Sequence, residues 1–149
     1  MIVIDTGPII AAANRKDASH QQCAELLETF PGPLLLPQPL LAEIGYMLAS
    51  RAGVQAEAGF LRDVADGVYD LVAVVQDDVN RAAQLVERYS DLPLGTADAV
   101  VVAVAERYGA ATIATLDRPT SALSAPPMCL PLLCCPEADS LGFRSWTWP

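Results

Sequence analysis

Short apolar segments alternate with longer segments of helical periodicity along the first 118 residues. Strands alternating with helices indicate an α/β fold, in which parallel strands are joined by helices that pack on the faces of the sheet. We therefore predict an α/β/α sandwich with a central, mainly parallel sheet. The expected strands are 2–4, 34–36, 71–75 and 112–116. The expected helices end near 13, 30, 50, 65, 89 and 108, and Gly109 is a natural stop for the last of them.

The composition changes after Arg118. Six of the twelve prolines, three of the four cysteines and both tryptophans lie in 119–149. Helical and strand periodicity is lost there, and Pro131 argues against a central strand. The sequence thus predicts one folded domain over 1–118 and an irregular tail rich in proline and cysteine over 119–149, with room for one edge strand within 128–135.

The chain is strongly acidic, with a net charge of −9, one lysine and eight arginines. An acidic protein repels nucleic acid at long range, so chemistry on nucleic acid requires local arginines or bound cations. The acids form either a solvated surface or a metal site. The four cysteines have no CxxC spacing and are assigned to packing. With neither an uninterrupted apolar segment long enough to span a membrane nor a basic N-terminal region before an apolar one, the chain is expected to be cytoplasmic.

Three aspartates occupy positions where α/β enzymes place functional groups. Asp5 and Asp117 each follow a predicted strand, and Asp98 lies in the first turn of a predicted helix, two residues after Thr96. Sites in open parallel sheets lie just beyond the carboxyl ends of strands, and the positive end of a helix favours a carboxylate. Each position also has an ordinary explanation, since aspartate is common in turns and in first helical turns.

Glu43 lies on the flank of an apolar helical face. Leu40, Ile44 and Met47 belong to that face, and Glu43 falls beside it on a helical wheel. An acid at such a position either extends to solvent or points into a shared cleft with a partner. Four carboxylates without a nearby lysine or histidine suggest a hard cation, since Mg²⁺ and Mn²⁺ prefer oxygen ligands. Such ions support the hydrolysis of phosphodiesters.

Asp5 belongs to an Asp-Thr-Gly sequence, which is also how an aspartic protease presents its catalytic carboxylate. Those proteases are all-β proteins with a second copy of the motif. This chain has several predicted helices and no second Asp-Thr-Gly, so its context excludes that class.

Four short motifs together resemble the PIN-domain nucleases, and most of all the VapC toxins of bacterial toxin–antitoxin pairs. The motifs are Ile-Val-Ile-Asp-Thr at the start, Pro-Leu-Leu-Ala-Glu-Ile at 39–44, Thr-Ala-Asp-Ala at 96–99 and Thr-Leu-Asp-Arg at 115–118. The resemblance covers residues 1 to about 118. From Pro119 onward the chain departs from the family, whose members usually continue with a short regular strand.

The resemblance implies a cluster of acids that holds one or two Mg²⁺ or Mn²⁺ ions. Asp5 and Asp98 would be the principal ligands, Glu43 would act directly or through water, and Asp117 would complete a second, weaker site. Hydroxyl groups would support these acids, and Arg118 is a candidate for holding RNA phosphate. The supporting hydroxyls are those of Thr6, Thr96 and Thr115.

The resemblance also implies an activity and partners. The activity is that of an endoribonuclease toxin of a type II toxin–antitoxin system, in which a metal-activated water cleaves structured RNA such as tRNA or ribosomal RNA. The partners are a small antitoxin protein and a second copy of the chain. The alternative is a catalytically weak or inactive PIN-fold protein that acts by binding RNA or a partner protein.

Overall fold

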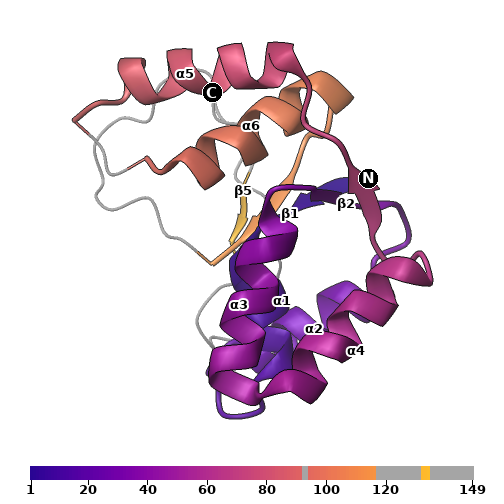
Figure 1. Ribbon diagram of the computed structural model, residues 1–149. Helices are drawn as coiled ribbons and strands as arrows, with labels where there is room; N and C mark the ends of the chain where they lie inside the picture. Colours follow the sequence, from indigo (N-terminus) through magenta and orange to yellow (C-terminus); the bar gives the residue numbers. More distant parts are fainter. Residues whose placement is uncertain (92–93, 117–131, 135–149) are drawn as a thin grey trace.

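The computed structural model describes residues 1–91, 94–116 and 132–134, and in these residues parallel strands form one five-stranded sheet (Figure 1). The strand order is β3-β2-β1-β4-β5, and every neighbouring pair is parallel. The predicted α/β/α sandwich is confirmed. The strands are β1 Ile2–Ile4, β2 Leu34–Pro37, β3 Asp70–Val72, β4 Ile113–Thr115 and β5 Leu132–Cys134.

Helices cover both faces of the sheet. Figure 1 shows α5 and α6 on one side of it and α1 to α4 on the other. Contacts agree with this arrangement, since α6 packs on β1, β2 and β4, whereas α1 packs on β4 and α3 on β2. The helices are α1 Thr6–Ala13, α2 His20–Thr29, α3 Leu40–Ala52, α4 Val54–Ala65, α5 Gln76–Arg88 and α6 Thr96–Tyr108.

The central strand β1 lies in the middle of the core. Its three residues are buried on both faces, as expected for an apolar strand between two helical layers. The strand order reverses beside β1, because the chain first adds β2 and β3 on one side and later adds β4 on the other. In open α/β sheets, binding sites lie at the carboxyl ends of the strands beside such a reversal, which here is the edge between β1 and β4.

Most differences between the predicted and observed elements concern their ends. The third strand was expected over 71–75 but covers Asp70–Val72. The N-cap residue of α5 is Val75, and the Asp78 carboxylate accepts a hydrogen bond from the Val75 amide at 2.9 Å. Gly109 ends α6 in the left-handed conformation, with φ of 62°, as predicted.

Two ion pairs join α5 to α6. The Arg107 Nε atom donates to both Asp78 carboxylate oxygens, at 2.8 and 3.1 Å, and Arg107 Nη2 donates to the Ala73 carbonyl. Arg81 donates to both oxygens of Glu106, at 2.7 and 2.9 Å. Asp78 is 2% exposed, so its charge depends on these partners. The hydrogen bond from Arg107 to Asp78 raises the pKa of the guanidinium above its ordinary value.

Within the part of the chain that the structure describes, none of the helices combines the length and the apolar composition needed to cross a membrane.

Candidate active site

The fold brings four chain segments to one edge of the sheet. Asp5 follows β1 and Thr115 ends β4, and these parallel strands are neighbours. The helix after β2 and the helix before β4 both begin at this edge, because each runs antiparallel to the strand that it joins. Glu43 is in the first turn of the former helix, α3, and Asp98 is in the first turn of the latter, α6.

The Asp5 carboxylate is buried and held from two sides. Its Oδ1 atom accepts a hydrogen bond from the Thr6 amide at 2.7 Å, and its Oδ2 atom accepts one from the Thr115 hydroxyl at 2.7 Å. The Asp5 amide donates to the Ala114 carbonyl. Asp5 is 7% exposed, and as the N-cap residue of α1 it lies at the positive end of that helix. Charge-assisted hydrogen bonds and the helix end therefore offset the burial of a carboxylate.

Gly7 allows the first turn of α1 to approach the chain that leaves β4. A Cβ atom at Gly7 would lie 3.1 Å from the Leu116 Cβ atom and 3.4 Å from the Leu116 amide nitrogen. Such a contact is tighter than most Cβ contacts, so a side chain here would require Leu116 to shift by a few tenths of an ångström. The glycine of the Asp-Thr-Gly sequence thus serves the packing of α1 against the exit of β4.

Thr6 is the first residue of α1 and follows the N-cap residue Asp5. Thr6 is 6% exposed. Among the described residues, its hydroxyl oxygen is buried and has no hydrogen-bond partner. An unsatisfied buried hydroxyl lowers stability.

We expect Thr6→Val to raise the free energy of unfolding by about 1 kcal/mol in EDTA, because a buried hydroxyl without a partner costs about 1–3 kcal/mol. Urea denaturation followed by circular dichroism measures this change. Thr96→Val is the matched control, since Thr96 also begins a helix but is exposed, and its stability should hardly change. A Thr6→Val protein that is less stable than the wild type would contradict the prediction.

Asp98 occupies the third position of α6 and reaches back to the start of that helix. Its Oδ2 atom accepts a hydrogen bond from the Gly95 amide at 3.1 Å. The helix begins at Thr96 and its N-cap residue is Gly95. Asp98 is half-buried, whereas Thr96 is exposed. The carboxylate is thereby oriented at the positive end of α6.

Glu43 is exposed, although its neighbour Ile44 is fully buried. Of the two positions expected for it, the side chain takes the one that extends to solvent. Among the described residues, acidic, histidine and cysteine side chains form no group of three or more that could hold a metal, so Asp5, Glu43 and Asp98 do not converge on one ion there. Asp117 and Arg118 lie outside the described residues, and their predicted roles stay predictions.

The donor chemistry at this edge nevertheless fits a hydrated hard cation. The groups are carboxylate oxygens of Asp5 and Asp98 and the buried, unpartnered hydroxyl of Thr6. Mg²⁺ usually keeps several waters and binds proteins through one or two carboxylates rather than a complete cage. Oxygen ligands of this kind suit Mg²⁺ or Mn²⁺ and do not favour zinc.

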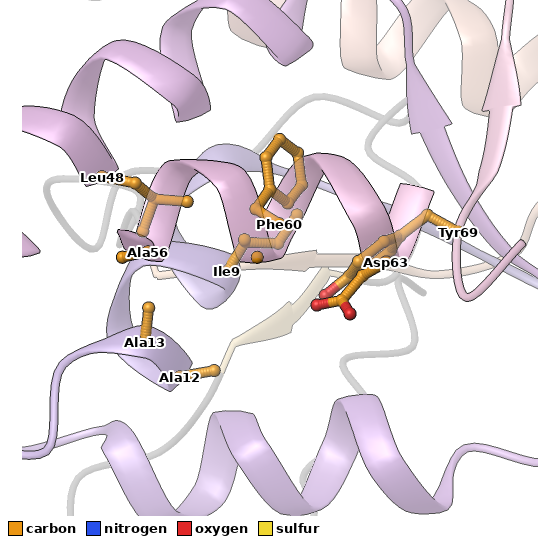
Figure 2. Close-up of a pocket in the computed structure, with 9 residues that line it drawn as sticks. Ile9, Ala12, Ala13, Leu48, Ala56, Phe60, Asp63 and Tyr69 are labelled. Carbon is orange, nitrogen blue, oxygen red and sulfur yellow. The ribbon is translucent and has the colours of Figure 1, made fainter. Parts of the chain in front are cut away.

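A second feature is an apolar groove on the helical layer formed by α1, α3 and α4 (Figure 2). Its volume is about 260 Å³. Figure 2 shows Asp63 and Tyr69 at one end of the groove and Leu48 and Ala56 at the other, with Phe60 between them. Burial and the nearby charge of Asp63 raise the pKa of Tyr69 to about 12, so its phenol stays protonated at neutral pH.

No motif in the sequence predicts this groove. Small residues of α4 line it, since Ala56 and Gly59 are about one helical turn apart and both belong to its lining. A Cβ atom at Gly59 would meet no atom within 4 Å. Small residues at helical spacing beside Phe60 and Asp63 were the available signal, but the same pattern also occurs in closely packed helices.

The chain belongs to the PIN domain family, whose model matches residues 2–124. This confirms the resemblance found in the sequence. A similar protein is the ribonuclease VapC26 of Mycobacterium tuberculosis, which is 34% identical over 117 residues, covering 78% of this chain and 87% of that protein.

Solved structures show the same fold. VapC20 of Mycobacterium tuberculosis, described as a Sarcin-Ricin loop cleaving toxin, has a TM-score of 0.70 and 22% identity over 76% of this chain and 87% of its own. A toxin–antitoxin complex from Klebsiella pneumoniae has a TM-score of 0.64 and 16% identity over 93% of this chain and 100% of its own.

Proposed function

We propose that this chain is a ribonuclease of the VapC type and the toxin of a toxin–antitoxin pair, which cleaves RNA phosphodiester bonds with Mg²⁺ or Mn²⁺. Membership in the PIN domain family and the 34% identity to a ribonuclease support the class of enzyme. The observation that carries the proposal for this site is the Asp5 carboxylate, which is buried and held by hydrogen bonds at the carboxyl ends of β1 and β4.

A bound divalent ion would supply Lewis acidity toward the phosphoryl oxygen and lower the pKa of a water bound to it. Asp5 and Asp98 would hold one or two such ions, each with a carboxylate that the protein has already oriented. Glu43, exposed at the start of α3, would orient a water. Asp117 would complete a second, weaker site, and Arg118 would hold a phosphate. Thr6, Thr96 and Thr115 would support these acids.

The proposed substrate is structured RNA, such as tRNA or ribosomal RNA. A net charge of −9 opposes long-range attraction of RNA, so binding depends on local cations and on shape. We therefore expect divalent ions to strengthen RNA binding as well as to support cleavage. A chain that binds RNA without cleaving it would instead be the inactive PIN-fold alternative.

The test is incubation of the purified protein with total tRNA and ribosomal RNA in Mg²⁺, in Mn²⁺ and in EDTA. Cleavage in either metal and its loss in EDTA is the expected result. Ca²⁺ is a useful addition, because it takes oxygen ligands but with a larger, more flexible geometry. Tight RNA binding without cleavage in any metal would rule out the enzyme and support the alternative.

The proposed protein partner is a small antitoxin, and the groove beside α4 suits a segment of it. The groove is mostly apolar, and Asp63 places a carboxylate at one end. An apolar side chain followed by an arginine or lysine would match both properties, as a basic segment matches an acidic chain. An open reading frame immediately upstream of the gene is the expected source of this antitoxin.

Gly59→Leu tests this partner surface, because Gly59 lines the groove and a Cβ atom added there would meet no atom within 4 Å. We expect the affinity for the co-expressed antitoxin to fall at least about tenfold, since a filled groove excludes a buried anchor residue. Cleavage by the free toxin should be unchanged. Binding is measured by co-purification and by titration calorimetry.

The matched control is Ala65→Leu, which adds the same side chain to an exposed position at the end of the same helix, away from the groove. It should bind the antitoxin as the wild type does. Unchanged binding by the Gly59→Leu protein would show that the groove lies outside the antitoxin interface.

A second copy of the chain is the remaining proposed partner. The outer face of α5 exposes valines at helical spacing, namely Val79 and Val86, and Val75 precedes them. Exposed apolar side chains in one stripe suit an interface between copies. The localisation that we propose is the cytoplasm.

A further inference from the structure

The two ion pairs between α5 and α6 show how these helices run past each other. Asp78, near the start of α5, pairs with Arg107 at the end of α6, and one turn later Arg81 pairs with Glu106. The two helices also pack along each other (Figure 1). They are therefore antiparallel, and the end of α5 lies beside the beginning of α6.

Arg88, in the last turn of α5, is thereby level with Asp98 of the candidate site. Arg88 lies ten residues after Asp78 in its helix, and Asp98 lies nine residues before Arg107 in the other, so both are about equally far from that ion pair. Arg88 also follows Arg81 by about two full helical turns. It therefore leaves α5 on the side from which Arg81 reaches α6.

The charge of Arg88 is not neutralised by a carboxylate. Arg81 and Arg107 are each paired with an acid, whereas Arg88 is exposed and forms no ion pair with the residues that the structure describes. Its Cζ atom lies 5.6 Å from the centre of the Tyr89 ring. This cation–π contact restrains the guanidinium and leaves its positive charge in place.

We propose that Arg88 binds a phosphate that flanks the scissile phosphate of the RNA strand, an inference that rests on the proposed function. Asp5 and Asp98 would hold the ion that neutralises the scissile phosphate, but the flanking phosphates keep their charge and the acidic chain repels them. An unpaired arginine level with Asp98 supplies positive charge there. Its guanidinium can donate two parallel hydrogen bonds to phosphate oxygens, which positions the strand without reading its sequence.

The experiment compares Arg88→Gln with Arg51→Gln, which removes the same charge from an exposed arginine in the last turn of α3, at the opposite end of that helix from Glu43. Cleavage of total tRNA is measured in Mg²⁺ or Mn²⁺ from about 50 to 200 mM salt. One phosphate contact changes the slope of log affinity against log salt by about 0.7–0.9, which is about five- to eightfold in affinity at 0.1 M salt.

We therefore expect Arg88→Gln to raise KM about five- to eightfold at 0.1 M salt, to make the salt dependence shallower and to leave kcat unchanged. Arg51→Gln should behave as the wild type does. Arg88→Lys keeps the charge, so it should keep the salt dependence, with a smaller rise in KM because an ammonium lacks the planar pair of donors. Circular dichroism checks that each variant is folded.

The possible results separate this inference from the proposed function. Equal KM values for the Arg88→Gln and Arg51→Gln proteins would overturn the role of Arg88 and leave the proposed function intact. A lower kcat with an unchanged KM and salt dependence would also overturn it, because a contact to a flanking phosphate acts on binding. A wild-type protein that cleaves no RNA in either metal would overturn the proposed function and this inference with it.

Discussion

Asp5→Asn should lower the rate of RNA cleavage by at least about 100-fold, because a metal-bound site contributes several kcal/mol to catalysis and each 1.4 kcal/mol is about tenfold in rate. Asparagine preserves the shape of the side chain and can still accept the hydrogen bond from the Thr6 amide. Its amide group can donate to the Thr115 hydroxyl, which accepts as well as donates. The fold should therefore be kept while the negative charge is removed.

Single-turnover cleavage of a labelled RNA measures this effect, and the metal affinity of the variant should fall with the rate. Asp70→Asn is the matched control, because Asp70 is exposed on the edge strand β3 and makes the same change of charge. If the Asp5→Asn and Asp70→Asn proteins cleave RNA equally fast, Asp5 is not part of the active site.

Asp78→Ala should lower the free energy of unfolding by about 2–4 kcal/mol. The carboxylate is almost fully buried, accepts two hydrogen bonds from Arg107 and caps the first turn of α5 through the Val75 amide. A helix cap contributes about 1 kcal/mol, and hydrogen bonds to charged groups contribute about 1.5–3 kcal/mol each. The Arg107 side chain is 32% exposed and regains part of its hydration, which keeps the loss below a simple sum.

Asp77→Ala is the control for this change, because Asp77 lies in the same helical turn but is exposed. Only its interaction with the helix end is lost, which is about 0.3–1 kcal/mol. Urea denaturation of both variants measures the difference. Equal losses of stability in the two proteins would mean that the Asp78–Arg107 pair does not hold α5 to α6.

The fold could be predicted because the apolar segments are short and regularly separated by helical patterns. The ends of the helices were harder, since several polar residues near each start can serve as the cap. At α1 the aspartate caps and the threonine begins the helix, whereas at α6 a glycine is the N-cap and Asp98 reaches back to it. Local sequence allows each of these choices, and packing decides among them.

Part of the candidate site could also be predicted from the sequence. The position of Asp5 follows from the topology of parallel sheets, because a strand end is recognisable in the sequence. The bond from Thr115 depends on the register between β1 and β4, which no local pattern reports. The space at Gly7 depends on Leu116, which is about as far from Gly7 in the sequence as Thr115 is from Asp5.

Because β1 lies in the centre of the sheet, it pairs with its two neighbouring strands at different stages of synthesis. Its partner β2 follows closely in the chain, but its other neighbour, β4, ends at Thr115, and contacts between distant segments form late in folding. Because synthesis proceeds from the N-terminus, Asp5 leaves the ribosome early and gains its hydrogen bond from Thr115 only when β4 has emerged and paired. A nascent chain therefore carries Asp5 for most of translation without this hydrogen bond, so the proposed active site would be complete only on a nearly finished domain.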